Sequence, residues 1–148
     1  MKKKLSIVSI LLVLILALCS FAACGKGTAK VTVLENKEEI LVIRADETKE
    51  DVSLENVLQN LKKSGKIQYE ISDGFVTSVN GHLPAADEFW GLYTTLTEYK
   101  GVTYAGTYPG SYTYGETVCV SADYGVNGLP MIEGHLYILK ITSMSEMF

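Results

Sequence analysis

The aromatic residues of this sequence have types and spacing that indicate ligand binding. Trp90 is the only tryptophan among the 148 residues, and it lies in the run "EFWGLYT" from 88 to 94. An aromatic face can stack against a planar ligand, whereas a single tryptophan in a strand can equally fill a core. On an alternating strand Tyr93 points to the opposite face from Trp90. We predict ligand contacts at Trp90 and Tyr93, with core packing as the alternative for Trp90.

Tyrosines form the second unusual feature, because five of them fall within sixteen residues and are interleaved with glycine and threonine. They are Tyr99, Tyr104, Tyr108, Tyr112 and Tyr114. Tyrosine offers apolar area and a hydroxyl group at a low entropic cost, which is why binding loops use it. The rings either cover a sheet edge or form a rim that recognises a ligand, a glycan or another protein. For the rim we predict contacts from Tyr99, Tyr104, Tyr108 and Tyr112.

Catalytic and metal-binding patterns are weak by comparison. His82 and His135 have no carboxylates near them in the sequence that could complete a metal site. Asp87 and Glu88 are adjacent, so on a strand they point to opposite faces and do not form a catalytic pair. The sequence contains no Ser-His-Asp order, no glycine-rich loop that opens a helix and no H-E-x-x-H motif. We therefore expect no metal site and no enzymatic activity, and an enzyme is only the third hypothesis.

One amphipathic helix is predicted over residues 53–65, "SLENVLQNLKKSG". Its apolar residues recur at helical spacing, at Leu54, Val57, Leu58 and Leu61. Ser53 suits the N-cap, and Gly65 can take the left-handed conformation that ends a helix. The apolar stripe must pack against a sheet.

Strands are predicted on both sides of this helix. Residues 30–34 and 40–45 precede it, and the second run, "ILVIRA", is apolar enough for burial on both faces. Residues 67–71 and 75–79 form a hairpin around Asp73-Gly74, and Asn80-Gly81 marks a second tight turn. Residues 88–99, 116–124 and 135–144 are further strands, and 101–114 is a loop. The order strand, strand, helix, strands predicts an α+β fold that is β-grasp-like, with one helix on a mixed β-sheet and β-hairpin extensions.

The N-terminus predicts export. Lys2 to Lys4 precede an uncharged stretch from Leu5 to Ala23, and "FAAC" places small residues directly before Cys24. This stretch resembles a bacterial lipobox, which implies lipidation of Cys24 and anchoring at the extracytoplasmic face of the membrane. An uncleaved membrane anchor is the alternative. The expected organisation is a signal peptide over 1–23, a lipidated cysteine and tether over 24–30, and one domain over 31–148.

Composition limits the remaining classes. Without the lysines at positions 2–4, ten basic residues face 17 acidic ones, so the net charge is −7. Such an acidic domain is a poor partner for nucleic acid. If Cys24 carries a lipid, Cys119 has no cysteine partner. Its place in "ETVCVSA" predicts packing as a small buried hydrophobe.

Four segments together are similar to one known family. The helix "VSLENVLQNL", the hairpin "GFVTSVNG", the strand "FWGLYT" and the closing "EGHLYILKI" resemble a bacterial domain of unknown function allied to the C-terminal β-domain of transcobalamin and intrinsic factor. The similarity covers roughly residues 50 to 142. It implies a β-grasp domain on a surface lipoprotein and makes cobalamin or another corrinoid the first ligand class to test. The alternative is an adhesion or assembly module that binds a surface protein or cell-wall polymer through the tyrosine-rich loop.

Overall fold

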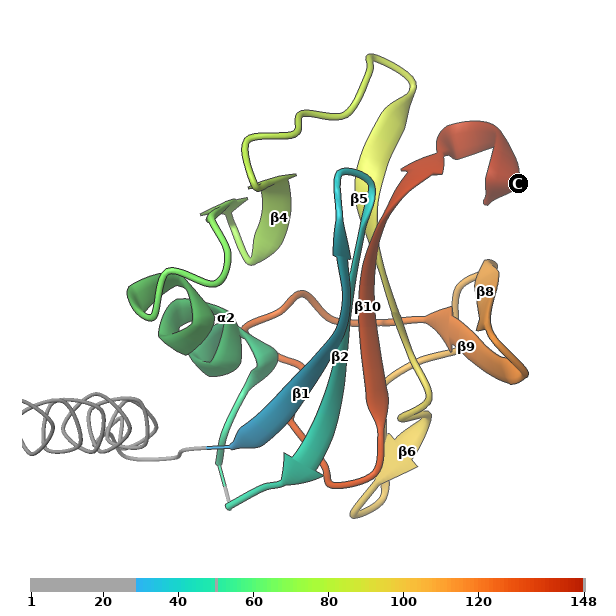
Figure 1. Ribbon diagram of the computed structural model, residues 1–148. Coiled ribbons are helices and arrows are strands. Elements are labelled where there is room, and N and C mark those ends of the chain that lie inside the picture. The colour runs from blue at the N-terminus through green and yellow to red at the C-terminus, as the bar shows by residue number, and fades with distance from the viewer. Residues whose placement is uncertain (1–28, 50, 148) are drawn as a thin grey trace, which may run out of the picture.

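The computed structural model describes residues 29–49 and 51–147, so Cys24 and the expected signal peptide lie outside the described residues (Figure 1). Six strands form one sheet: β1 (Lys30–Lys37), β2 (Ile40–Glu47), β5 (Glu88–Thr94), β8 (Ser111–Tyr114), β9 (Thr117–Ser121) and β10 (Leu136–Ser143). Their order across it is β1-β2-β10-β5-β9-β8. Two ribbons accompany the sheet: β3 (Tyr69–Ser72) with β4 (Phe75–Val79), and β6 (Glu98–Tyr99) with β7 (Val102–Thr103). No helix in the described ranges is long and apolar enough to cross a membrane.

The helix α2 (Leu54–Lys63) forms where the sequence predicts it. The Ser53 hydroxyl accepts a hydrogen bond from the Asn56 N–H, and the Asn56 side chain accepts one from the Ser53 N–H, so the first turn is capped in both directions. All four residues of the predicted apolar stripe are buried. Each such side chain contributes about 1.5–3 kcal/mol when it leaves water. Figure 1 shows the helix beside one face of the sheet. The apolar stripe of the helix packs in one core with side chains from this face.

The sheet buries side chains on both faces. Leu41 and Ile43 of β2 face the helix and join the larger core, whereas Val42 between them packs on the opposite face with Ile138 and Cys119. Partly buried tyrosines of β8 cover this second cluster. The predictions that "ILVIRA" is buried on both faces and that Cys119 packs as a small hydrophobe are therefore confirmed.

One helix packed on a sheet with hairpin extensions confirms an α+β architecture, but the prediction of a mixed sheet is wrong. Every strand pair in the described ranges is antiparallel. The cause lies in the loop that precedes β10, which returns the chain to the end of β2. The Ala45 N–H donates to the His135 carbonyl at 3.1 Å, and the Gly134 N–H donates to the Ala45 carbonyl at 2.9 Å. Because β10 begins beside the end of β2, it runs back along that strand.

The long strand predicted over 88–99 is also corrected. β5 ends at Thr94, whose hydroxyl donates to the Leu136 carbonyl and accepts from the Leu96 N–H. These bonds turn the chain, and residues 98–103 form the separate β6-β7 ribbon. The predicted loop 101–114 contains β7 and β8, since Tyr112 and its neighbours pair with β9. The tight turns at Asp73-Gly74 and Asn80-Gly81 are confirmed, with positive φ at all four residues.

Candidate functional site

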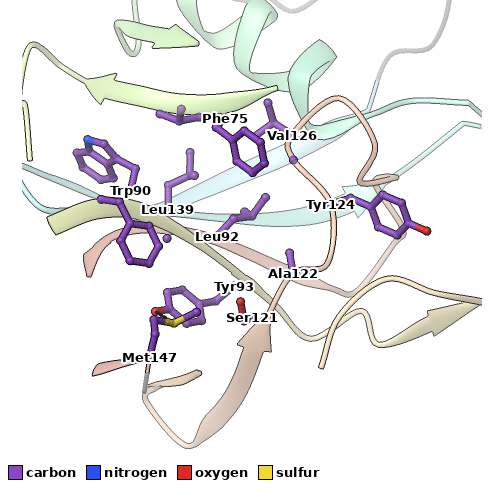
Figure 2. A pocket seen from close by; sticks show the side chains of 14 residues that line it. Phe75, Trp90, Leu92, Tyr93, Ser121, Ala122, Tyr124, Val126, Leu139 and Met147 are labelled. Atoms are coloured by element: carbon purple, nitrogen blue, oxygen red, sulfur yellow. Dashed lines mark hydrogen bonds between the residues drawn. The ribbon is translucent and has the colours of Figure 1, made fainter. Parts of the chain in front are cut away.

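A cavity of about 150 Å³ lies where β5 and the chain that follows β9 separate (Figure 2). β5 and β9 pair only at two positions, Tyr93 with Ser121 and Thr94 with Val120. The last backbone bond between them runs from the Ala122 N–H to the Leu92 carbonyl at 2.9 Å. Beyond it the chain turns toward the β3-β4 hairpin, where the Val126 N–H donates to the Gly74 carbonyl at 3.0 Å. The cavity therefore fills the angle between a strand and a departing chain.

Aromatic rings form much of its wall, and they come from three separate parts of the chain. They are Phe75 of β4, Phe89, Trp90 and Tyr93 of β5, and Tyr124 of the loop after β9. Leu92, Val126, Leu139 and Met147 add aliphatic and thioether surface (Figure 2). Phe75 is 67% exposed and Tyr124 is 45% exposed, whereas Trp90 is only 6% exposed. The rings thus grade from a buried wall to an accessible mouth, which is the arrangement of an apolar binding site.

Trp90 is both a core residue and part of this wall. It belongs to the larger core beneath the helix, as the core-packing alternative predicts. Its Nε1–H donates to the His82 carbonyl at 3.2 Å, which satisfies its polar atom. The sequence poses core packing and ligand contact as alternatives for Trp90, but the residue both belongs to the core and lines the cavity.

Tyr93 reaches the cavity from the other face of β5. Its hydroxyl and the Thr142 hydroxyl share a hydrogen bond at 2.9 Å, and burial raises its pKa, a shift that the Thr142 bond opposes. The ring lies over Gly91, where an added Cβ would come within 2.9 Å of the Tyr93 ring and 2.7 Å of the Thr142 hydroxyl. Glycine at 91 is therefore what lets the tyrosine lie flat against its own strand.

Two of the predicted loop tyrosines support cavity residues instead of lining the cavity. The Tyr112 ring lies against Tyr93 with centroids 6.2 Å apart, and the Tyr104 ring lies against Tyr124 at 5.6 Å. Both separations fall within the range of favourable aromatic pairs. Tyr112 and Tyr104 are partly buried, so they hold the rings that do face the cavity.

The other two predicted tyrosines lie apart from it. Tyr99 packs partly buried against the larger core with the Lys100 ammonium 5.2 Å from its ring centroid. Tyr108 is 60% exposed. The structure therefore brings Trp90 and Tyr93 together at the cavity and does not gather the loop tyrosines into one rim.

Sequence reasoning missed the residues that complete the cavity, above all Phe75, Phe89, Tyr124 and Met147. Phe75 directly follows the predicted turn Asp73-Gly74, and a large apolar side chain at this position is the one signal that the sequence offers. Phe89 lies on β5, Tyr124 in the loop after β9 and Met147 after β10, so they become neighbours only through the long-range packing of the fold.

Among the histidines and carboxylates singled out in the sequence, the side chains of His135 and Glu88 have hydrogen-bond partners. The His135 Nδ1 lies 3.0 Å from the Thr95 hydroxyl, and the Glu88 carboxylate accepts from the Ala85 N–H at 3.0 Å. Within residues 29–49 and 51–147, no three His, Cys, Asp or Glu side chains lie close enough to hold a metal ion.

Comparisons of this chain with protein-family models, with curated proteins and with solved structures find no match.

Proposed function

We propose that this chain is a non-enzymatic bacterial lipoprotein, anchored through Cys24 at the extracytoplasmic face of the membrane, that captures a ligand in the aromatic cavity beside β5. One observation carries the proposal. Five aromatic side chains from β4, β5 and the loop after β9 converge on one cavity, and two of them are exposed at its mouth. A lining of rings and aliphatic side chains suits binding of an apolar group better than acid–base or nucleophilic chemistry.

The size of the cavity supports an apolar group of modest bulk as the buried part of the ligand. An apolar cavity of about 150 Å³ in another protein stays dry and binds benzene. This cavity has about the same volume. It therefore suits one aromatic or branched side chain of a partner protein, and this favours the protein-binding alternative from the sequence.

Corrinoid capture is the second candidate, and the exposed rings of Phe75 and Tyr124 favour it. A corrin ring is far larger than the cavity and would lie across the mouth, stacked on those two rings. The β-grasp-like assignment belongs to the same proposal. It is supported by the order hairpin, helix, strands, and the antiparallel pairing of β2 with β10 is the point at which this chain departs from the expected mixed sheet.

Ligand capture can be tested on the protein in lipid nanodiscs, because Trp90 is the only tryptophan and forms a wall of the cavity. Iodobenzene, whose heavy atom quenches indole fluorescence, should quench Trp90 saturably. Cobinamide and cobalamin are titrated by calorimetry in parallel. Phe75→Ser should weaken whichever ligand binds, and Tyr108→Ser, at an exposed aromatic residue outside the cavity, is the matched control. Quenching that never saturates, together with no heat from either corrinoid, would contradict the capture proposal.

The anchor has its own test. Cys24→Ser should abolish incorporation of labelled palmitate and leave the uncharged stretch from Leu5 to Ala23 attached to the protein. Cys19→Ser is the control, since bulky Leu18 makes position 19 a poor lipidation site. Wild-type protein that carries no palmitate and keeps residues 1–23, as measured by mass spectrometry, would favour the uncleaved anchor.

A further inference from the structure

The outer edge of β5 is open beside the cavity. Trp90 is paired with Ile141 of β10, but the Ile141 N–H donates to the Glu39 carbonyl, on the other side of β10. In an antiparallel pair this means that the N–H and C=O groups of Trp90 point away from β10. The Leu92 carbonyl, two residues along, points the same way and accepts from the Ala122 N–H.

No strand in the described part of the chain pairs with this edge before Tyr93. β9 meets β5 only at Tyr93 and Thr94, whereas β10 follows its other edge from Glu88 onward. An open strand edge is a template for another extended chain. Natural sheets usually blunt such edges with charged side chains, above all lysine, with proline or with a bulge. The segment "EFWGL" contains no lysine or proline, and its one charged residue, Glu88, stands at its start.

Apolar residues lie on both faces of the open edge. Trp90 and Leu92 point to the face that carries the helix, and Phe89 and Tyr93 point to the opposite face. Consecutive residues of an added strand would point alternately to these two faces. Both sets would meet apolar surface, so the added strand would have to be apolar at consecutive positions, as β2 is.

The charge around the cavity adds a second requirement. Three residues that directly precede lining residues in the sequence are acidic: Glu88, Asp123 and Glu146. A fourth acid, Asp73, is separated from the lining residue Phe75 by Gly74. The sequence that follows residue 23 also has a net charge of −7, which complements basic residues at the ends of an apolar segment.

We propose that the ligand is an extended apolar segment of a partner protein, flanked by basic residues, which adds as a strand to the edge of β5 and places one aromatic or branched side chain in the cavity. This inference rests on the proposed function, because it names the ligand class of the same cavity. Backbone bonds to the Trp90 N–H and C=O and to the Leu92 N–H would supply affinity, and the cavity would select the side chain, as in other complexes formed by strand addition.

The test uses the protein in lipid nanodiscs and a nine-residue peptide with two lysines at each end of Val-Phe-Val-Ile-Val. A second peptide carries N-methyl groups on alternate central residues, in the register that removes the N–H groups facing β5, and has the same side chains. Exchange of the Trp90 and Leu92 amides is followed by NMR. The unmodified peptide should slow both amides by about tenfold or more, and N-methylation should weaken binding by about the same factor, since each lost backbone bond is worth ~1 kcal/mol.

The possible results separate the two proposals. If both peptides bind equally and Phe75→Ser weakens both, strand addition is overturned and capture in the cavity stands. If neither peptide binds while iodobenzene or cobinamide does, strand addition is likewise overturned. Slowed exchange at Trp90 and Leu92 that Phe75→Ser reduces and Tyr108→Ser leaves unchanged would establish it.

Discussion

The indole Nε1–H of Trp90 donates a hydrogen bond to the main-chain carbonyl of His82 at 3.2 Å. This bond joins β5 to the turn after β4, so the segment between them is held at both ends. His82 is also bridged to Val79 across the Asn80-Gly81 turn. The tryptophan thus has a fixed orientation, with one part in the core and one part against the cavity. A rigid aromatic wall of this kind costs little entropy when a ligand binds.

Replacing Trp90 should therefore lower the free energy of unfolding, in addition to any effect on ligand binding. Trp90→Ala removes a side chain that is only 6% exposed and should lower the free energy of unfolding by about 3–5 kcal/mol. Trp90→Phe keeps an aromatic ring but loses the bond to His82 and should cost roughly 1–2 kcal/mol. Urea unfolding followed by circular dichroism measures both. Near-wild-type stability of the alanine variant would show that Trp90 is not part of the core.

The tyrosines of residues 101–114, the predicted loop, should differ in how much they contribute to stability. Tyr112→Ala removes the partner of Tyr93 and part of the cover over Cys119, and should cost about 1–3 kcal/mol. Tyr108→Ala removes a ring that is 60% exposed and should change stability by no more than about 0.5 kcal/mol. Thermal unfolding of the two variants side by side provides the comparison. If both variants lose the same amount of stability, both rings are packed against the fold. If neither variant loses stability, Tyr112 is a surface residue.

Local features of this fold could be predicted from the sequence. The helix cap at Ser53, the left-handed Gly65 and the turns at Asp73 and Asn80 each depend on a few neighbouring residues, and all form as expected. The burial of Leu41 to Ile43 on both faces follows from the continuous apolar run "ILVI". These features require no knowledge of which strands are neighbours.

The sheet order and most of the cavity could not be predicted in this way. Whether β10 runs parallel or antiparallel to β2 depends on where the loop before Leu136 returns. Tyr124 and Phe75 line the same cavity because the chain after β9 leaves β5 and bonds to Gly74, an interaction across about fifty residues. The tyrosine-rich segment looked like a loop because glycines interrupt it, yet Tyr112 pairs with Cys119 in a regular ladder.

Cys119 provides a probe of the layer that covers the second face. Its side chain is fully buried, and burial raises the pKa of the thiol, so the reactive thiolate is both hidden and disfavoured. Alkylation by iodoacetamide should be slower in the native protein than in urea by on the order of a hundredfold. Thr113→Cys in an otherwise wild-type chain, at an exposed position of β8, is the matched control for access. Rapid native alkylation of Cys119, measured by mass spectrometry, would mean that β8 opens locally.

Alkaline pH should destabilise the protein through Tyr137. Its hydroxyl donates to the Pro130 carbonyl and accepts from the Ile132 N–H, both at 2.8 Å, and burial raises its pKa from 10.0 to about 12. The folded state therefore keeps this proton after the unfolded chain has lost it. Stability should not depend on Tyr137 ionisation below pH 10.0 and should fall between there and about pH 12, by on the order of 2 kcal/mol. Tyr137→Phe should be less stable at neutral pH, because two buried backbone groups lose their partner, and should lose less stability in the alkaline range. Urea midpoints measured across that range decide the matter, and an unchanged alkaline slope in the variant would assign the effect to other tyrosines.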